Sequence, residues 1–334
     1  MILSNSNPID FIIYDKQKNM DKPLDLICLN KNEISENTKK YTSNQVKSLD
    51  FAKKVYYSQL KNIELFFDED TLYKINHSGI TFDLFCNLKK ESSILYVLGQ
   101  GAIDEQKRHK YGLPLFQRWS WFEDFPYSVM IFSDPTLYIG NLEIGWFQGT
   151  KETYYLPLTC EIIQHFINRL GLTTKNIIFS GSSAGGFTSL MMAGYFPNSS
   201  VFVNNPQTDI RKYHQSLFEK LISICFSGIS LEEALDIKFE SRFSVVKHYH
   251  DTKNIPNIYY AQNINDKFHM QNHFMPFANE IAKMAAENRS FGDIHFFTEL
   301  YCDEKLNHNP FPKKDFLQRL NRTKHFFSKT LIGK

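Results

Sequence analysis

The sequence predicts an α/β fold in which a mostly parallel sheet is covered by helices on both faces. Short, nearly continuous apolar runs alternate with amphipathic stretches along most of the chain, as buried parallel strands and crossover helices do. In addition, 33 consecutive residues, Asn176 to Thr208, carry no charge, although glycines and polar residues interrupt them. Such a segment is typical of the centre of a sheet rather than of a membrane span. A chain of 334 residues is long enough for one large domain and a modest extension.

Residues 1–65 are predicted to form an N-terminal extension. Two short apolar runs, Phe11–Tyr14 and Leu24–Leu29, could be strands. Apolar residues then recur mostly every three or four positions from Val46 to Ile63, which predicts an amphipathic helix. No residues of this extension suggest chemistry, so we expect function to lie in a second domain over 66–334.

The second domain begins with a predicted hairpin, in which two strands flank the turn sequence His77-Ser78-Gly79. The further strands are predicted at Ser93–Leu98, Ser128–Phe132, Asn176–Phe179, Ser200–Val203, Asn257–Ala261 and Ile294–Leu300. The helices between and after them are predicted at Glu161–Leu170, Gly186–Tyr195, Gln271–Asn288 and Lys314–Lys329.

Residues 211–251 interrupt this alternation with about forty residues. Two amphipathic stretches in the segment, Ser216–Ser227 and Leu231–Phe239, fit an inserted helical cap over the carboxyl edge of the sheet. An ordinary long crossover explains the same pattern, and both interpretations remain open.

The clearest chemical motif is a strand–turn–helix passage around Ser183. The strand Asn176–Phe179 runs into the sequence Ser-Gly-Ser-Ser-Ala-Gly-Gly and then into an apolar helix, which is the G-x-S-x-G pattern in its required context. Gly181 and Gly185 are small enough for strand and helix to approach closely, so that Ser183 is presented above the sheet. The alternative is a connecting or phosphate-cradling turn, but the turn lacks the lysine of a phosphate-binding loop.

A serine nucleophile needs a base, and the base needs an orienting acid. In this architecture the acid and the histidine follow the serine, each on a loop after a strand. Asp266 follows Asn257–Ala261, and His308 follows the final strand, so both fit. Asp209 and Asp303 are alternative acids. Other histidines compete for the role of base, but those in the insertion, in the final strand and in the last helix fit the position less well.

Two groups of residues complete the predicted site. The first would stabilise an oxyanion: the backbone N–H of Ala184 at the helix start, and that of Gln100 or Gly101 in the glycine-rich loop after Ser93–Leu98. That loop could equally be a plain turn.

The second group would bind substrate. All three tryptophans lie in an aromatic-rich stretch over 116–149, and Trp119 and Trp146 could stack on a sugar ring. The alternative is a hydrophobic cluster under a long loop. His269 lies close after Asp266 and is predicted to line the same pocket.

Composition excludes several other classes of protein. The net charge of +2 argues against a protein that coats nucleic acid or another polyanion. The five cysteines are widely spaced and form no metal-ligand pattern, so we expect reduced thiols and no metal. The first residues show no secretory signal pattern, and no run is apolar enough for a transmembrane segment. We therefore expect a cytoplasmic protein; its oligomeric state is not predicted.

The Gly-Ser-Ser-Ala-Gly-Gly turn, Asp266 and His308 together resemble the α/β-hydrolase superfamily over roughly residues 70–330. The stretches SDPTLY, LEIGWFQGT and GSSAGGF are also similar to a group of bacterial α/β-hydrolase-like proteins linked to surface-polysaccharide biosynthesis. Some relatives of that type are serine-dependent sugar O-acetyltransferases or acetyl esterases.

The resemblance implies acyl transfer through an acyl-Ser183 intermediate. The expected reaction is O-acetylation of a capsule sugar, with acetyl-CoA as acyl-donor cosubstrate and no bound cofactor. Two alternatives remain: a carbohydrate acetyl esterase or deacetylase of the same fold, acting on a carbohydrate or small ester, and a non-catalytic assembly protein that retains the fold.

Overall fold

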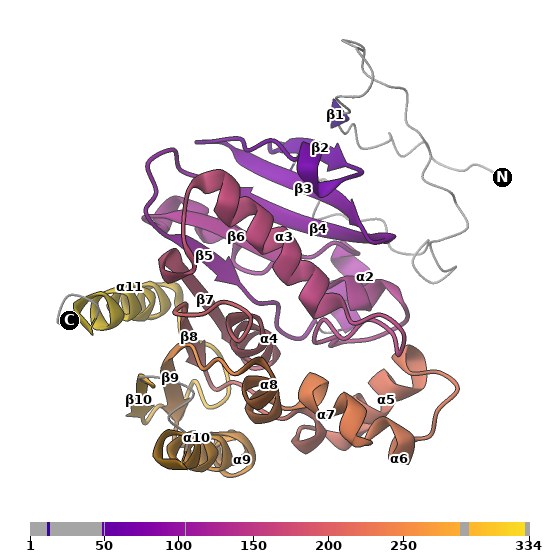
Figure 1. Cartoon of the computed structure of the whole chain (residues 1–334), viewed down its shortest axis with the longest axis vertical. Helices are drawn as coiled ribbons and strands as arrows, with labels where there is room; N and C mark the ends of the chain where they lie inside the picture. The colour runs from indigo at the N-terminus through magenta and orange to yellow at the C-terminus, as the bar shows by residue number, and fades with distance from the viewer. Residues whose placement is uncertain (1–11, 14–48, 50, 104, 288–293, 331–334) are drawn as a thin grey trace.

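The strands of the computed structural model form one sheet in the order β1-β2-β3-β4-β6-β5-β7-β8-β9-β10 (Figure 1). The structure describes residues 12–13, 49, 51–103, 105–287 and 294–330. Only β4 runs antiparallel to its neighbours, so the predicted mostly parallel sheet is confirmed for these residues. The strands are β1 Ile12–Ile13, β2 Lys53–Tyr57, β3 Asp70–His77, β4 Ile80–Asn87, β5 Leu95–Leu98, β6 Ser128–Ser133, β7 Ile177–Ser182, β8 Ser200–Asn204, β9 Asn257–Asn263 and β10 Phe296–Tyr301.

Helices cover both faces of this sheet, as predicted. The α-helices are α2 Glu105–Tyr111, α3 Tyr155–Leu170, α4 Ala184–Ala193, α5 Gln215–Cys225, α6 Leu231–Ala234, α7 Ile237–Phe243, α8 Val245–Thr252, α9 Lys267–His269, α10 Met275–Glu287 and α11 Lys313–Thr330. Short 3-10 turns are η2 Leu60–Asn62, η3 Trp119–Asp124, η4 Pro135–Tyr138, η5 Thr174–Asn176 and η6 Ile210–Lys212, and η7 Met270–Phe274 is a π-helical turn.

Two apolar layers lie on opposite faces of the sheet because side chains alternate along each strand. In β5, Leu95 and Val97 belong to the core beneath α3, α4, α8 and α10. Tyr96 and Leu98 belong instead to the core beneath η3 and α11. The strands at the centre are therefore buried on both sides, which explains the continuous apolar runs in the sequence.

The predicted helix over Val46–Ile63 is wrong, because residues 53–57 form strand β2, which pairs in parallel with β3. Val55 and Tyr57 are buried two positions apart, which is the alternation of a strand, because residues two apart point to different faces of a helix. The described part of the predicted extension thus continues the main sheet. Strand β1 lies within the first predicted apolar run, and Leu24–Leu29 lies outside the described residues.

The segment 211–251 contains η6 and helices α5 to α8 and connects β8 with β9. Helices α5, α6 and α7 gather at the lower right of the molecule in Figure 1, beyond the end of α4. The predicted helices of the segment 211–251 are confirmed, and the role of this segment as a cap stays a prediction.

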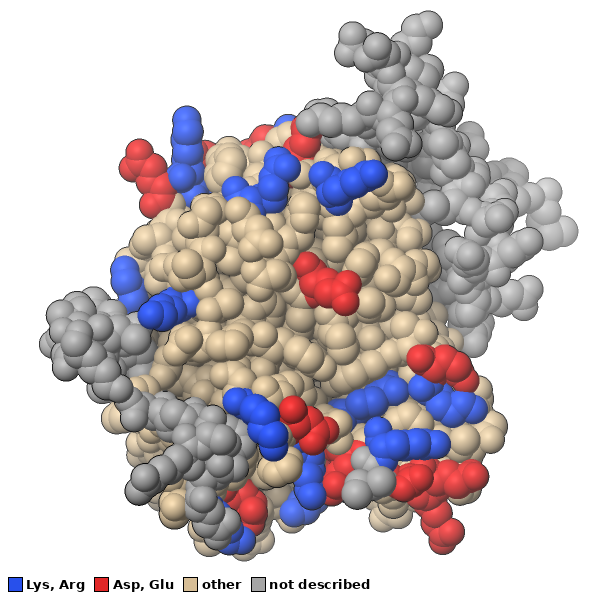
Figure 2. All heavy atoms as spheres, viewed as in Figure 1, with Lys and Arg blue, Asp and Glu red and all other residues tan. Residues whose placement is uncertain are grey.

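Charged side chains are unevenly placed on the face shown in Figure 2. The middle of this face is largely uncharged, and Lys and Arg near its lower edge are interspersed with Asp and Glu. This mixed arrangement offers a polyanion no broad positive surface on that face. Within the described part of the chain, no helix combines the length and the apolar character that a membrane crossing requires.

Candidate active site

Ser183 lies on a tight turn between β7 and α4. Its φ of 54° and ψ of −123° are unusual for a residue with a side chain, and the surrounding packing enforces them. A Cβ on Gly181 would lie 2.2 Å from the carbonyl oxygen of Gly185, and a Cβ on Gly185 would lie 2.7 Å from that of Gly99. The glycines therefore permit the close approach of strand and helix that the turn needs.

The structure brings Ser183, His308 and Asp266 into one hydrogen-bonded chain. Ser183 Oγ lies 2.9 Å from His308 Nε2, and His308 Nδ1 lies 2.6 Å from Asp266 Oδ2. Burial raises the pKa of Asp266, but hydrogen bonds from His269 and His308 outweigh burial and hold it below its usual range. The carboxylate is thus ionised and fixes the proton of His308 on Nδ1, which leaves Nε2 to accept the serine proton.

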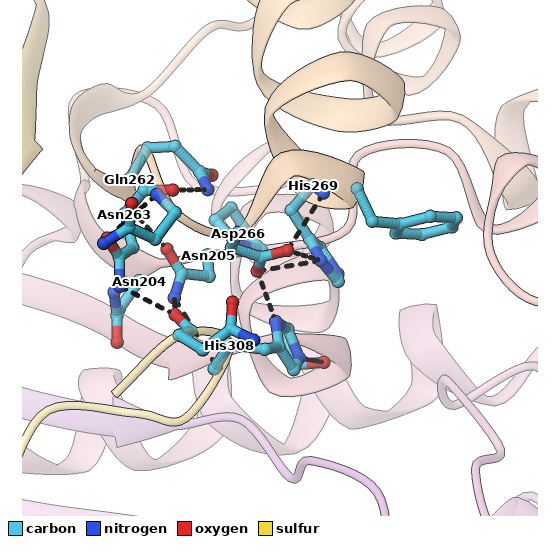
Figure 3. Close-up of polar contacts among 12 residues, drawn as sticks. Asn204, Asn205, Gln262, Asn263, Asp266, His269 and His308 are labelled. Carbon is cyan, nitrogen blue, oxygen red and sulfur yellow. Dashed lines mark hydrogen bonds and ion pairs between the residues drawn. The ribbon is translucent and has the colours of Figure 1, made fainter. Parts of the chain in front are cut away.

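His269 shares the Asp266 carboxylate with His308 (Figure 3). Its Nδ1 lies 3.1 Å from Oδ1 and 3.0 Å from Oδ2, and its backbone N–H donates to Oδ1. The two imidazole rings are stacked, with centroids 4.0 Å apart and planes 16° apart. Burial lowers the pKa of His269, so its ring is a neutral donor that helps to hold the acid. The predicted substrate contact of His269 stays a prediction.

Asp266, His269 and His308 also have ligand atoms within 4.8 Å of one another, as a metal site would. A metal would require ring nitrogens that here donate to the carboxylate, or the Nε2 that faces Ser183. Their hydrogen bonds to one another account for the arrangement, and the absence of a metal stays a prediction.

Three buried asparagines at the carboxyl ends of β8 and β9 hold the loop that carries His308 (Figure 3). Asn263 Nδ2 donates to the carbonyls of Asp303 and Asn307, and its Oδ1 accepts from the Asp303 N–H. Asn205 donates to the carbonyls of Asn307 and His308, and Asn204 accepts from the N–H of Phe311. The asparagines thus anchor the backbone on both sides of His308.

The two predicted oxyanion elements lie side by side. Ala184 is the first residue of α4, where N–H groups have no partner within the helix. Gly99, Gln100 and Gly101 pack against Gly185 of the same turn. The Gly101 N–H donates to Gln117 Oε1 at 2.8 Å, so the backbone N–H of Gln100 is the better placed candidate in this loop. All three residues stay predicted oxyanion donors.

The predicted sugar-stacking tryptophans lie in different environments. Trp119 is half-buried and contacts Phe51 and Phe85, with ring centroids 6.1 and 6.4 Å apart. Trp146 is only 1% exposed, and its indole N–H donates to Gln207 at 2.6 Å. Sugar stacking stays a prediction for both, and the burial of Trp146 favours a different role for it.

Sequence reasoning missed Gln207, Tyr213 and the asparagines. Gln207 Nε2 lies 3.3 Å from Ser183 Oγ. Burial raises the pKa of Tyr213, and the nearby Ser183 and Gln207 side chains oppose this, so Tyr213 belongs to the surroundings of Ser183. One feature of the sequence could have revealed them. The amide side chains of Asn204, Asn205 and Gln207 lie at or just after the end of β8, within the charge-free segment, and so at the edge of the sheet where Ser183, Asp266 and His308 are predicted to meet.

Comparisons with known proteins give a fold but no sequence family. No family model matches the chain, and no curated protein matches its sequence. Among solved structures, the capsule O-acetyltransferase of Neisseria meningitidis serogroup A is 16% identical, with a TM-score of 0.53 over 74% of this chain and 96% of that chain. A histidine-to-alanine variant of that enzyme in complex with CoA is 17% identical, with a TM-score of 0.51 over 73% and 96%.

Longer peptidases are also similar. Dipeptidyl peptidase 4 of Porphyromonas gingivalis is 14% identical, with a TM-score of 0.51 over 79% of this chain and 36% of that chain. Prolyl oligopeptidase B of Galerina marginata is 12% identical, with a TM-score of 0.52 over 78% and 36%. These similarities agree with the sheet order and the turn at Ser183, and the chain therefore has an α/β-hydrolase-like fold.

Proposed function

We propose that the protein is a serine-dependent acyl-transfer enzyme that works through an acyl-Ser183 intermediate. The observation that carries the proposal is the continuous chain from Ser183 Oγ through His308 to Asp266, at 2.9 and 2.6 Å. These distances are within hydrogen-bond reach for a nucleophile and its base. A non-catalytic relative would not need to keep all three groups in this geometry.

In the first half-reaction, Ser183 Oγ attacks the acyl carbon while its proton passes to His308 Nε2. The carbonyl π electrons move to oxygen, where the N–H groups of Ala184 and Gln100 would stabilise the charge. The bond to the leaving group then breaks, and His308 returns the proton to the leaving group. In the second half-reaction, His308 takes a proton from the acceptor, whose oxygen attacks the acyl carbon. The bond from that carbon to Ser183 Oγ then breaks, and His308 returns the proton to Oγ.

The acceptor we propose is a hydroxyl of a bacterial capsule or other surface-polysaccharide sugar, and the acyl donor is acetyl-CoA. The leaving group is then the CoA thiol. Two points support this choice: the sequence stretches that are similar to surface-polysaccharide proteins, and the similarity in fold to a capsule O-acetyltransferase with a CoA-bound structure. The helices α5 to α8 would act as the cap that keeps water from the acyl-enzyme.

A carbohydrate acetyl esterase is the second candidate, and one observation favours it. The His308 side chain is 37% exposed, so water can approach the group that would activate it. Transfer and hydrolysis share every step except the identity of the acceptor.

The test incubates the protein with acetyl-CoA and candidate capsule glycans, and separately with p-nitrophenyl acetate. We expect acetylated glycan and an acetyl adduct on Ser183, both detected by mass spectrometry. Ser183→Ala should lower both activities by about 10⁴-fold or more, because it removes the nucleophile. Ser182→Ala, at the neighbouring buried serine, is the matched control.

Full activity of Ser183→Ala would contradict the proposed nucleophile. A wild-type protein that only hydrolyses esters would replace the transferase by the esterase.

A further inference from the structure

Gln207 is a second polar contact of the nucleophile and lies outside the triad. It follows β8, its side chain is 0% exposed, and its Nε2 lies 3.3 Å from Ser183 Oγ. Its backbone N–H also donates to the carbonyl of Ser183 at 3.2 Å. The inference below rests on the proposed acyl-Ser183 function and adds a residue to it.

The orientation of the Gln207 amide follows from its other contact. An indole N–H can only donate, and Trp146 Nε1 lies 2.6 Å from Gln207 Oε1. The oxygen of the amide must therefore face Trp146, and its NH₂ group must face Ser183.

The donors then run in one direction through the site. Trp146 donates to Gln207, Gln207 donates to Ser183 Oγ, Ser183 donates to His308 Nε2, and His308 donates to Asp266. Because Oγ accepts from Gln207, its own proton is directed toward His308, as attack on an acyl carbon requires.

The loop that carries Trp146 is held in a costly conformation. Trp146 and Phe147 both have positive φ, 48° and 55°, a strained backbone conformation that persists only where the surrounding contacts enforce it. Asp134 supplies part of that surrounding, since its Oδ2 accepts from the Phe147 N–H at 2.9 Å. Its Oδ1 also accepts from the N–H of Thr136 at 2.8 Å. Because Asp134 holds this strained turn beside Ser183, we infer that the turn serves to position the Trp146 side chain.

We propose that Gln207 is a catalytic hydrogen-bond donor that directs the Ser183 Oγ proton toward His308 and stabilises the partial negative charge on Oγ as that proton leaves, and that Trp146 is the positioning residue that orients Gln207. At 3.3 Å the contact is weak in the resting state, and a hydrogen bond strengthens when its acceptor gains charge. Gln207 transfers no proton: the serine proton goes to His308, and the new bond forms between Oγ and the acyl carbon.

The experiment measures the acylation rate constant from the burst of p-nitrophenol released from p-nitrophenyl acetate. Gln207→Leu removes the donor, and we expect acylation to be about 10²-fold slower, as for loss of one preorganised donor. Trp146→Phe removes the indole N–H but keeps the ring and should slow acylation by about tenfold, the equivalent of 1.4 kcal/mol. Trp121→Phe, whose ring packs against Phe316, is the matched control.

Gln207→Glu gives a signature that structural damage would not produce. A protonated glutamic acid can still donate, whereas an ionised one places negative charge beside Oγ. Its acylation rate relative to wild type should therefore fall as the pH rises through the titration of the new carboxyl.

Thermal melting identifies variants that fold, and if Gln207→Leu fails to fold, Trp146→Phe decides. If a folded Gln207→Leu acylates within about twofold of the wild-type rate, the inference is overturned. If Gln207→Leu does not fold, the same result in a folded Trp146→Phe overturns it. In that case a normal wild-type burst leaves the proposed function standing. A folded wild type that releases no p-nitrophenol and forms no acetyl adduct on Ser183 would overturn both.

Discussion

The two sides of the Ser183–His308 contact are held by different forces. Ser183 belongs to the charge-free segment Asn176–Thr208, and close packing of glycines around its turn fixes it. His308 belongs to a loop rich in charged and exposed residues, and hydrogen bonds from buried asparagines fix it. Backbone contact thus sets the position of Ser183, the proposed nucleophile, and a polar network sets the position of His308, the proposed base.

This difference means that the two sides fail in different ways. A close-packed turn tolerates no added atom, so damage there disrupts the fold as well as the site. A hydrogen-bonded loop can lose a partner and remain folded, so damage there lowers activity more than stability. Each of the following experiments tests one side of this comparison.

The largest effect is expected for Gly181→Ala. The added Cβ would lie 2.2 Å from the Gly185 carbonyl oxygen, a backbone atom that cannot move without shifting α4. We expect a loss of more than about 3 kcal/mol of unfolding free energy, as for severe overpacking, or no folded protein at all. Chemical denaturation and circular dichroism measure it.

Gly171→Ala is the matched control for this substitution. Gly171 ends α3 with a φ of 66°, but a Cβ there meets nothing within 4 Å. It should cost only about 1 kcal/mol, because strain without a clash is small. If Gly181→Ala and Gly171→Ala lose equal unfolding free energy, close packing does not fix the turn at Ser183.

A smaller effect, mainly on activity, is expected for Asn263→Ala. The substitution removes two bonds to the loop carbonyls of Asp303 and Asn307 and the acceptor for the Asp303 N–H. We expect kcat/KM for an acetyl ester to fall by about 10²-fold, because a base displaced by about 1 Å loses its alignment with Ser183. Unfolding free energy should fall by about 1–3 kcal/mol.

Asn265→Ala is its control, since the Asn265 side chain donates a hydrogen bond to Cys302 Sγ and none to the carbonyls that Asn263 holds. An Asn263→Ala variant with wild-type kcat/KM would mean that the polar network does not position His308.

The smallest effect is expected on the pH dependence of the unfolding free energy, through His248, which contacts helix α4 behind the turn at Ser183. His248 is buried, its ring contacts the Met191 carbonyl of α4, and burial lowers its pKa from 6.5 to about 4. Its neutral form is therefore favoured in the folded state, so stability is full above pH 6.5 and is lost as the pH falls toward 4. By linkage, the loss at pH 5 is about 2 kcal/mol.

His248→Gln removes this titration and should flatten the change in melting temperature between pH 7 and pH 5. The exposed His250→Gln is the control. An unchanged pH dependence in His248→Gln would show that the weakness at low pH lies elsewhere.

The fold and the positions of Ser183, Asp266 and His308 at one edge of the sheet could be predicted because local sequence carries them. Buried strands leave continuous apolar runs, the glycine pattern marks the turn at Ser183, and Asp266 and His308 each follow a strand. The strand Lys53–Tyr57 was missed because apolar residues from Val46 to Ile63 recur mostly every three or four positions, as in a helix, and only pairing with β3 reveals the strand.

The supporting residues could not be predicted from local pattern. Gln207 becomes significant only when the loop with Trp146, about sixty residues earlier in the chain, comes to lie against it. Asn263 similarly acts on a loop forty residues later. Such contacts depend on which strand ends are neighbours, and spacing along the chain does not reveal them.

Arg242 of α7 joins the inserted helices to the loop that carries Trp146. Its guanidinium donates to the carbonyls of Gln148 and Thr150, and the Gln148 side chain donates back to the Arg242 carbonyl. Displacement of α7 must therefore break these bonds or move that loop with it. Helix α7 and the loop that carries Trp146 therefore move together, and a sequence change that displaces Arg242 would also disturb the backbone that holds Trp146 against Gln207.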